Sequence, residues 1–123
     1  MSENRITGEL LDLLGLDAFL ALVEAHGGTR LYVPRQAGET QIVRDLGPAA
    51  ASRLVERYGG DYVRVPLARE HRARRLREEG FSNAQIARRL GMSESGVERL
   101  FHAMPAKPRK GVDPRQGSLF NLD

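Results

Sequence analysis

The sequence predicts a mainly α-helical protein with one short β element, in which an N-terminal helix–strand repeat precedes a C-terminal helix-turn-helix. Two observations predict this fold. Residues 14–34 align without gaps onto residues 46–66, and ten of the 21 paired positions are identical. Residues 81–102 contain two amphipathic segments separated by a glycine. The repeat indicates one supersecondary unit used twice, and the second pattern is typical of two helices joined by a tight turn.

The first copy of the repeat is predicted to be a helix, a glycine stop and a short strand. Apolar residues recur at helical spacing over residues 16–23. Gly27 and Gly28 follow, and we expect the helix to stop there. Residues 31–33 are Leu-Tyr-Val, a β-prone stretch that a proline ends.

The second copy has the same plan. Pro48 suits the first turn of a helix, where its missing N–H is no loss. Gly59 and Gly60 are expected to supply the left-handed turn that ends this helix, and residues 62–65 are β-prone. Because an isolated pair of such short strands is weak, we expect the two strands to pair either with each other or across a dimer.

Two shorter helices are predicted beside the repeat. Thr7 is expected to cap a leucine-rich helix over residues 10–14. A helical turn is expected over residues 41–46, at the end of a connector that begins at residue 36. Together with the repeat, these segments form a predicted dimerisation region, residues 1–66.

A basic helix is predicted over residues 67–79, and Gly80 is expected to end it. The residues expected on its buried side are Leu67, Ala68, His71 and Leu76. This helix opens the second predicted domain, residues 67–104. From residue 105 onward the chain is rich in Pro, Gly and Lys/Arg and is expected to be a flexible basic tail, residues 105–123.

The most informative stretch has the spacing of a helix-turn-helix. Ser82 and Gln85 form a capping box that opens the first helix. A steep helix crossing at close range needs a small residue, here Ala87, and the turn needs a residue that tolerates positive φ, here Gly91. The second helix needs a branched apolar anchor, here Val97. The alternative is an αα-hairpin that only packs.

The distribution of charge points to a polyanion as partner. The net charge is +3, but residues 1–62 carry six arginines and nine acidic residues, whereas residues 63–123 carry thirteen Lys/Arg and seven acidic residues. We therefore expect the second helix of the motif to enter the major groove of double-stranded DNA. The residues expected to read bases are Ser93, Glu94, Ser95, Glu98, Arg99 and His102. The residues expected to contact phosphates are Arg69, Arg72, Arg74, Arg75, Arg77, Gln85, Arg88 and Arg89.

Composition excludes several function classes. Cysteine is absent, so disulfide frameworks, thiolate metal sites and cysteine nucleophiles are excluded. The three histidines are scattered, the acidic residues show no metal-ligand spacing, and no phosphate-binding loop is present. We therefore expect no enzyme activity, no cofactor and no metal. No apolar run is long enough to span a membrane, and we expect a cytoplasmic protein.

The series of a Gly-Gly pair, a short strand ending in Val-Pro, a basic helix and the two-helix motif resembles the Mor/C family of phage transcription activators. The likeness covers residues 54–66 and 67–102, and residues 22–35 are also similar to the strand motif of that family. The family carries this strand motif once, whereas this chain carries it twice. Which copy corresponds to the family's linker is left open.

The resemblance implies a homodimer with intertwined N-terminal helices that activates phage or prophage promoters by recruiting the host RNA polymerase. It also implies a linker near a DNA minor groove. The residues that correspond to this linker are Gly59, Gly60, Tyr62 and Arg64. Activation as opposed to repression follows from the analogy alone, so a DNA-binding repressor is an alternative.

A second motif lies in the tail. Gln116, Ser118, Leu119 and Phe120 resemble the short peptide by which bacterial proteins dock on the replication sliding clamp. The same apolar residues are also suited to folding back onto this protein. The overall expectation is a sequence-specific DNA-binding transcription regulator, and a further alternative is a non-enzymatic phage adaptor or dimerisation protein that docks on the clamp through this tail.

Overall fold

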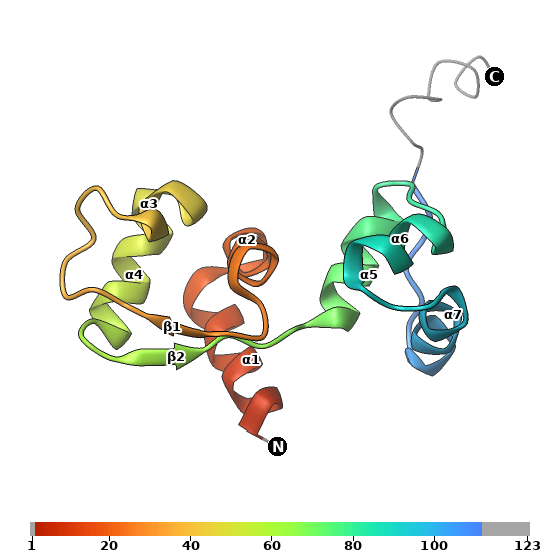
Figure 1. The fold of residues 1–123 in the computed structure, drawn as a ribbon, viewed down its shortest axis with the longest axis horizontal. Coiled ribbons are helices and arrows are strands. Elements are labelled where there is room, and N and C mark those ends of the chain that lie inside the picture. Colours follow the sequence, from red (N-terminus) through yellow and green to blue (C-terminus); the bar gives the residue numbers. More distant parts are fainter. Residues whose placement is uncertain (1, 112–123) are drawn as a thin grey trace, which may run out of the picture. The chain divides into compact units, whose positions relative to one another are not determined.

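The computed structural model describes residues 2–111, and the chain divides between Ala68 and Arg69 into two compact units. Unit 1 contains α1 (Ser2–Leu14), α2 (Leu16–His26), β1 (Arg30–Tyr32), α3 (Gln41–Leu46), α4 (Pro48–Tyr58) and β2 (Tyr62–Arg64). Unit 2 contains α5 (Arg69–Glu78), α6 (Asn83–Leu90) and α7 (Glu94–Ala103) (Figure 1). The described chain is therefore mainly helical with one small antiparallel sheet, which confirms the predicted fold class at this level.

The two strands pair with each other within the chain and lie side by side along one face of unit 1 (Figure 1). They are antiparallel, and Leu31 stands opposite Val63. These two residues occupy equivalent positions of the repeat, 32 residues apart. An antiparallel pair centred on equivalent residues is self-complementary, as in a two-fold symmetric interface. The two copies of the repeat are thus related by a local two-fold axis through this pair.

Backbone hydrogen bonds next to the strands show the same reciprocity. The Gly28 N–H donates to the Val65 carbonyl at 2.8 Å, and the Gly60 N–H donates to the Val33 carbonyl at 2.7 Å. Gly60 is the equivalent of Gly28 in the second copy, and Val33 is the equivalent of Val65 in the first copy. Each bond is therefore the counterpart of the other. The helices of the two copies are also equivalent, because α2 and α4 are both 11 residues long and end at the equivalent residues His26 and Tyr58.

The paired glycines after α2 and α4 have distinct conformations. Gly27 and Gly59 both have φ −54°, an ordinary value, whereas Gly28 and Gly60 have φ 81° and 85°. The prediction of a left-handed turn is therefore right only for the second glycine of each pair. Its positive φ lets the chain reverse into the strand without the steric cost that a Cβ imposes.

The core of unit 1 draws on both copies. Its buried residues are Leu10, Leu14, Phe19, Leu20, Leu22, Val23, Val33, Ile42, Ala50, Ala51, Leu54, Val63 and Val65. The predicted boundaries of α1 and of both strands are wrong. Helix α1 begins at Ser2, so Thr7 lies inside the helix and does not cap it. The first strand ends at Tyr32 rather than at residue 33, and the second ends at Arg64 rather than at residue 65; the valine after each strand is fully buried.

Polar contacts also join the two copies. The Arg53 guanidinium on α4 donates to the carbonyls of Leu13 and Leu14 at the end of α1, at 2.9 and 3.2 Å. The Tyr58 hydroxyl donates to Glu9 Oε2 at 3.1 Å. The Arg53 bonds satisfy carbonyls that a helix end leaves without an intrahelical partner, and all three bonds tie α4 to α1.

A carboxylate on α3 forms the corresponding contact with α2. His26 Nε2 lies 2.7 Å from Asp45 Oδ2, and Gln41 Nε2 donates to Asp45 Oδ1 at 2.9 Å. Partial burial acts to raise the pKa of Asp45, but the hydrogen bonds from Gln41 and His26 and the positive charges of His26 and Arg44 outweigh it, so the pKa lies below its ordinary value.

Candidate nucleic-acid interface

Helix α6 begins with the predicted capping box. Ser82 Oγ accepts a hydrogen bond from the Gln85 N–H at 3.2 Å, and Gln85 Oε1 accepts one from the Ser82 N–H at 2.8 Å. Two N–H groups at the helix start are satisfied in this way. Gln85 was predicted to contact a phosphate, and the carbonyl oxygen of its side chain is already engaged within unit 2.

The turn from α6 to α7 is tight and left-handed. Gly91 has φ 66° and ψ 39°, and its N–H together with that of Met92 donates to the Ala87 carbonyl. Ala87 and Val97 are both buried in the core of unit 2. Ser93 then caps α7 by accepting from the Gly96 N–H at 3.0 Å. Gly91 therefore forms the turn between the two helices, and Ala87 and Val97 are buried on either side of it.

Helix α5 completes the three-helix unit. Its buried residues are Ala73 and Leu76, so Leu76 is correctly predicted and Ala73 was missed. The helix begins at Arg69; Leu67 therefore precedes it, and Ala68 packs against the core of unit 1. The spacing of three between Ala73 and Leu76 is the signal that identifies this face, but alanine is also common on exposed helix faces.

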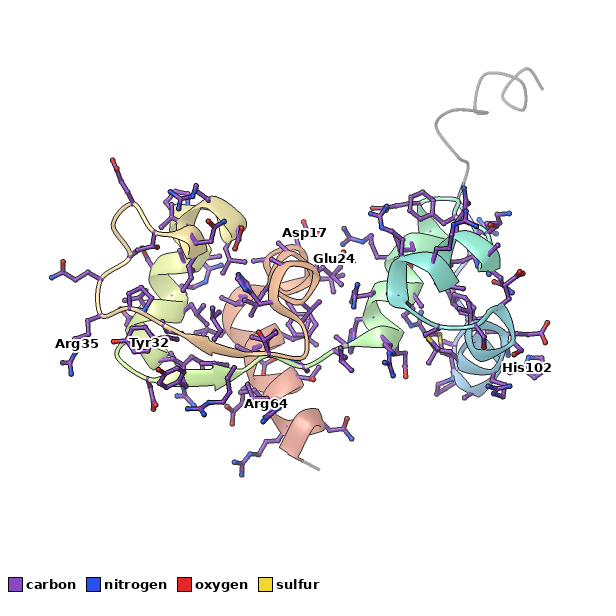
Figure 2. All side chains as sticks on the ribbon, viewed as in Figure 1. Asp17, Glu24, Tyr32, Arg35, Arg64 and His102 are labelled. Atoms are coloured by element: carbon purple, nitrogen blue, oxygen red, sulfur yellow. The ribbon has the colours of Figure 1, made fainter. Side chains whose placement is uncertain are left out.

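The outer face of α7 is exposed and polar. All six predicted base-reading residues are exposed: Ser93, Glu94, Ser95, Glu98, Arg99 and His102. They are exposed because Val97 turns the opposite face into the core. The His102 side chain points away from the helices of its unit (Figure 2). The face offers a guanidinium donor, two carboxylate acceptors, hydroxyls and an imidazole, which are the groups that bond to base edges.

Two exposed arginines lie on α6. Arg88 and Arg89 line an open hollow with Phe81 and Gln85. The Arg89 guanidinium lies 5.3 Å from the centre of the Phe81 ring, a cation–π distance that restricts its side chain. Two adjacent cations on one helix, one of them held by an aromatic ring, are suited to contact successive phosphates.

Arg77 serves unit 2 itself. Its guanidinium donates to the Phe81 carbonyl at 3.1 Å and to Asn83 Oδ1, and it lies 4.7 Å from the centre of the Phe101 ring. Burial lowers the pKa of Arg77 from its ordinary value. Its contacts tie the end of α5 to the start of α6 and to α7.

The chain after α7 lies along α5. Met104 is buried, the Arg74 guanidinium donates to the Ala106 carbonyl, and the Gly111 N–H donates to the Arg77 carbonyl at 2.9 Å. Three cations of this segment are exposed: Lys107, Arg109 and Lys110. Residues 112–123 lie outside the described residues, and with them the predicted clamp motif of Gln116, Ser118, Leu119 and Phe120.

The other predicted phosphate contacts lie on α5. Arg69 is exposed, whereas Arg72 and Arg75 are half-buried. Three of the eight predicted positions are therefore exposed cations, Arg69, Arg88 and Arg89, and the other five side chains are partly buried.

The predicted linker residues lie in unit 1. They belong to the antiparallel pair of β1 and β2, called the ribbon below, and to the turn that leads into it. Tyr62 and Arg64 are exposed on β2, and Tyr32 and Arg30 are exposed on β1. Tyr32 and Arg64 are labelled in Figure 2. The two tyrosine rings meet edge to face with centres 5.2 Å apart, and the Arg30 guanidinium lies 4.4 Å above the Tyr62 ring. Gly59 and Gly60 form the turn that leads into this ribbon. The ribbon thus presents an exposed surface of stacked aromatic and cationic groups.

Residues 2–111 contain no group of three His, Asp or Glu side chains close enough together to hold a metal ion. None of the helices in that range is long and apolar enough to cross a bilayer. Comparison with protein-family models, with curated proteins and with solved structures finds no match to this chain.

Proposed function

We propose that this chain is a sequence-specific DNA-binding transcription regulator in which α6, the Gly91 turn and α7 form a helix-turn-helix. The observation that carries the proposal is the division of α7 into two faces. Val97 anchors the inner face in a complete core, and six polar residues cover the outer face without apolar interruption. The major groove of B-DNA is about 12 Å wide and admits an α-helix, so this face reads base edges there.

Within that face, Arg99 and Glu98 have complementary roles. A guanidinium is suited to bond the O6 and N7 acceptors of guanine, and a carboxylate is suited to accept from the N4 amine of cytosine. The Ser93 hydroxyl caps the helix, so it supports the face as well as facing the DNA. Base selection therefore depends most on Arg99 and Glu98.

Phosphate contacts come from exposed cations beside the reading helix. Arg88 and Arg89 on α6 and Arg69 at the start of α5 are exposed. Each phosphate that such a cation neutralises releases condensed counterions, which adds affinity that is independent of sequence and sensitive to salt. Arg74 and Arg77 contribute less, because their guanidinium groups are hydrogen-bonded within the unit.

The ribbon of unit 1 is proposed as a second DNA contact. Tyr62 and Arg64 are exposed, and Arg30 stacks on Tyr62, so the side chains are partly ordered before binding. Arginine inserted into a narrow minor groove is a recurring mode of recognition. By the likeness to phage activators, we propose that this ribbon contacts a minor groove and that the protein activates transcription with the host RNA polymerase. In vitro transcription on a bound promoter, with and without the protein, separates an activator from a repressor.

The test begins with selection of binding duplexes from a random-sequence pool by the full chain. Arg99→Ala should then weaken binding to the selected duplex by about 1–3 kcal/mol and flatten base preference at one position. Arg88→Ala should weaken binding to selected and unrelated duplexes alike and lower the salt slope by about one.

Arg44→Ala is the matched control, since it removes one exposed arginine from α3 in unit 1 and leaves the proposed interface intact. Its affinity for DNA should equal that of the unchanged chain. The proposal fails if no duplex is enriched over the starting pool, or if Arg44→Ala weakens binding as much as Arg88→Ala does. Circular dichroism of each variant verifies that the helices remain folded.

A further inference from the structure

Unit 1 contains within one chain the partners that two identical chains normally supply to each other. In a symmetric dimer, a contact from residue i of one chain to residue j of the other is always repeated from j to i. Here the reciprocal bonds from Gly28 to Val65 and from Gly60 to Val33 join equivalent positions of the two copies. The Leu31–Val63 pair marks the local axis.

Side chains reinforce this pairing from both copies. His26 at the end of α2 contacts Asp45 on α3, and Tyr58, its equivalent at the end of α4, contacts Glu9 on α1. Each bond therefore runs from the last helical residue of one copy to the helix that precedes the other copy. The Arg53 guanidinium adds two more hydrogen bonds between the copies.

The surface of the described residues offers little for a stable second interface. Among residues 4–111, the large hydrophobic side chains that are exposed are Leu16, Tyr32 and Tyr62. Obligate homodimers typically bury about 2,000 Å² or more, and their interfaces are about 65% apolar. Two of these three side chains belong to the polar ribbon and contact each other.

We infer that this protein acts as a single chain, in which unit 1 is the covalently joined counterpart of a two-chain dimer. The inference rests on the proposed function for its consequence on DNA: one chain brings one copy of α7 to one binding site. The homodimer that the family resemblance implies is then replaced by pairing inside the chain. The selected DNA sequence accordingly has no inverted repeat, because only one reading helix contacts it.

The strongest competing arrangement places a second copy on a groove at the start of α2 and α4. This groove lies between the two copies of the repeat. It is lined by Leu14, Leu16, Leu46 and Pro48, by small residues, and by the charged residues Asp17 and Arg53. Leu16 is 51% exposed there. A dimer seated on this groove would bury Leu16, so replacing that residue by a charged one tests it directly.

Light scattering coupled to size exclusion measures the mass of the full chain without DNA. We expect 13.7 kDa, one chain, at concentrations well above those of the DNA-binding assays, and the same mass for Leu16→Glu. Twice that mass overturns the inference, and a return to 13.7 kDa in Leu16→Glu would then identify the groove as the dimer contact. This measurement holds whether or not the chain binds DNA.

Native mass spectrometry of the complex with a selected duplex tests the consequence on DNA. One chain for each duplex and a selected site without two-fold symmetry support the inference. Two chains for each duplex, or an inverted repeat with half-sites about one helical turn apart, overturn it. Absence of any complex would refute the proposed function. The mass of the free chain would still decide whether the protein is a single chain.

Discussion

Replacement of Gly59 by alanine tests how closely the two copies of the repeat approach each other. Gly59 has φ −54°, so alanine meets no conformational penalty there. The cost is one of space: a Cβ at this position would lie 2.5 Å from the Val55 carbonyl oxygen and 3.2 Å from that of Pro34. Both are backbone atoms. The closer one, on Val55, belongs to the same copy, so the end of α4 must shift, and Pro34 of the other copy must give by a few tenths of an ångström.

The expected cost is about 1–3 kcal/mol of unfolding free energy, the usual range for an added group in a well-packed interior. Tyrosine fluorescence measures it in unit 1 alone, because Tyr32, Tyr58 and Tyr62 are the only tyrosines of the chain and tryptophan is absent. In a urea titration the fluorescence midpoint should fall while the slope m stays constant, since the unfolded surface is unchanged.

Gly91→Ala is the matched control because its cost has a different origin and lies in the other unit. Gly91 has φ 66°, and no atom lies within 4 Å of the position a Cβ would take. The left-handed conformation alone should cost about 1–2 kcal/mol, seen by circular dichroism and not by tyrosine fluorescence. The reasoning is refuted if the fluorescence midpoint of Gly59→Ala is unshifted. It is also refuted if the fluorescence midpoint of Gly91→Ala is shifted.

Three further substitutions test the core of unit 2 and two polar contacts of unit 1. Ile86→Ala removes a fully buried side chain from unit 2 and should cost about 2–5 kcal/mol; circular dichroism should show early loss of helix with the tyrosine transition unmoved. Because the pKa of Asp45 is lowered in the folded chain, its contribution is complete above the unfolded value of 3.8 and is lost as the pH falls through the folded value. Asp45→Asn should therefore reduce the acid-side loss of stability in a pH series of urea titrations, and an identical pH profile would contradict this. Tyr58→Phe removes the bond to Glu9 and should lower the fluorescence midpoint by the equivalent of about 0.5–1.5 kcal/mol; an unchanged midpoint would mean that the bond adds nothing to stability.

Local chemistry accounts for what the sequence predicts well. The capping box at Ser82, the left-handed Gly91 and the buried Val97 each depend on residues within one or two helical turns. The offset of 32 between the copies of the repeat likewise predicts two equivalent helices, and α2 and α4 have equal lengths.

Tertiary contacts account for what the sequence leaves open or gets wrong. Pairing of the two strands within the chain depends on packing between the copies, and a local pattern does not distinguish it from pairing across a dimer. Helix α1 extends past Thr7 to Ser2, although a threonine before a leucine-rich run is typical of a cap. Ala73 is buried because α6 and α7 cover it, and its small side chain carries no strong signal of its own.

The local two-fold axis has a consequence for how this protein can change over time. In an assembly of identical subunits every substitution appears twice, so both halves of the interface must tolerate it. Joining the halves in one polypeptide removes that constraint, and each half is free to specialise. The ribbon already differs in this way, with Arg30 at the place that Tyr62 occupies in the other half and Tyr32 at the place of Arg64. One end of the ribbon therefore carries the two arginines and the other end carries the two tyrosines, although the backbone remains symmetric.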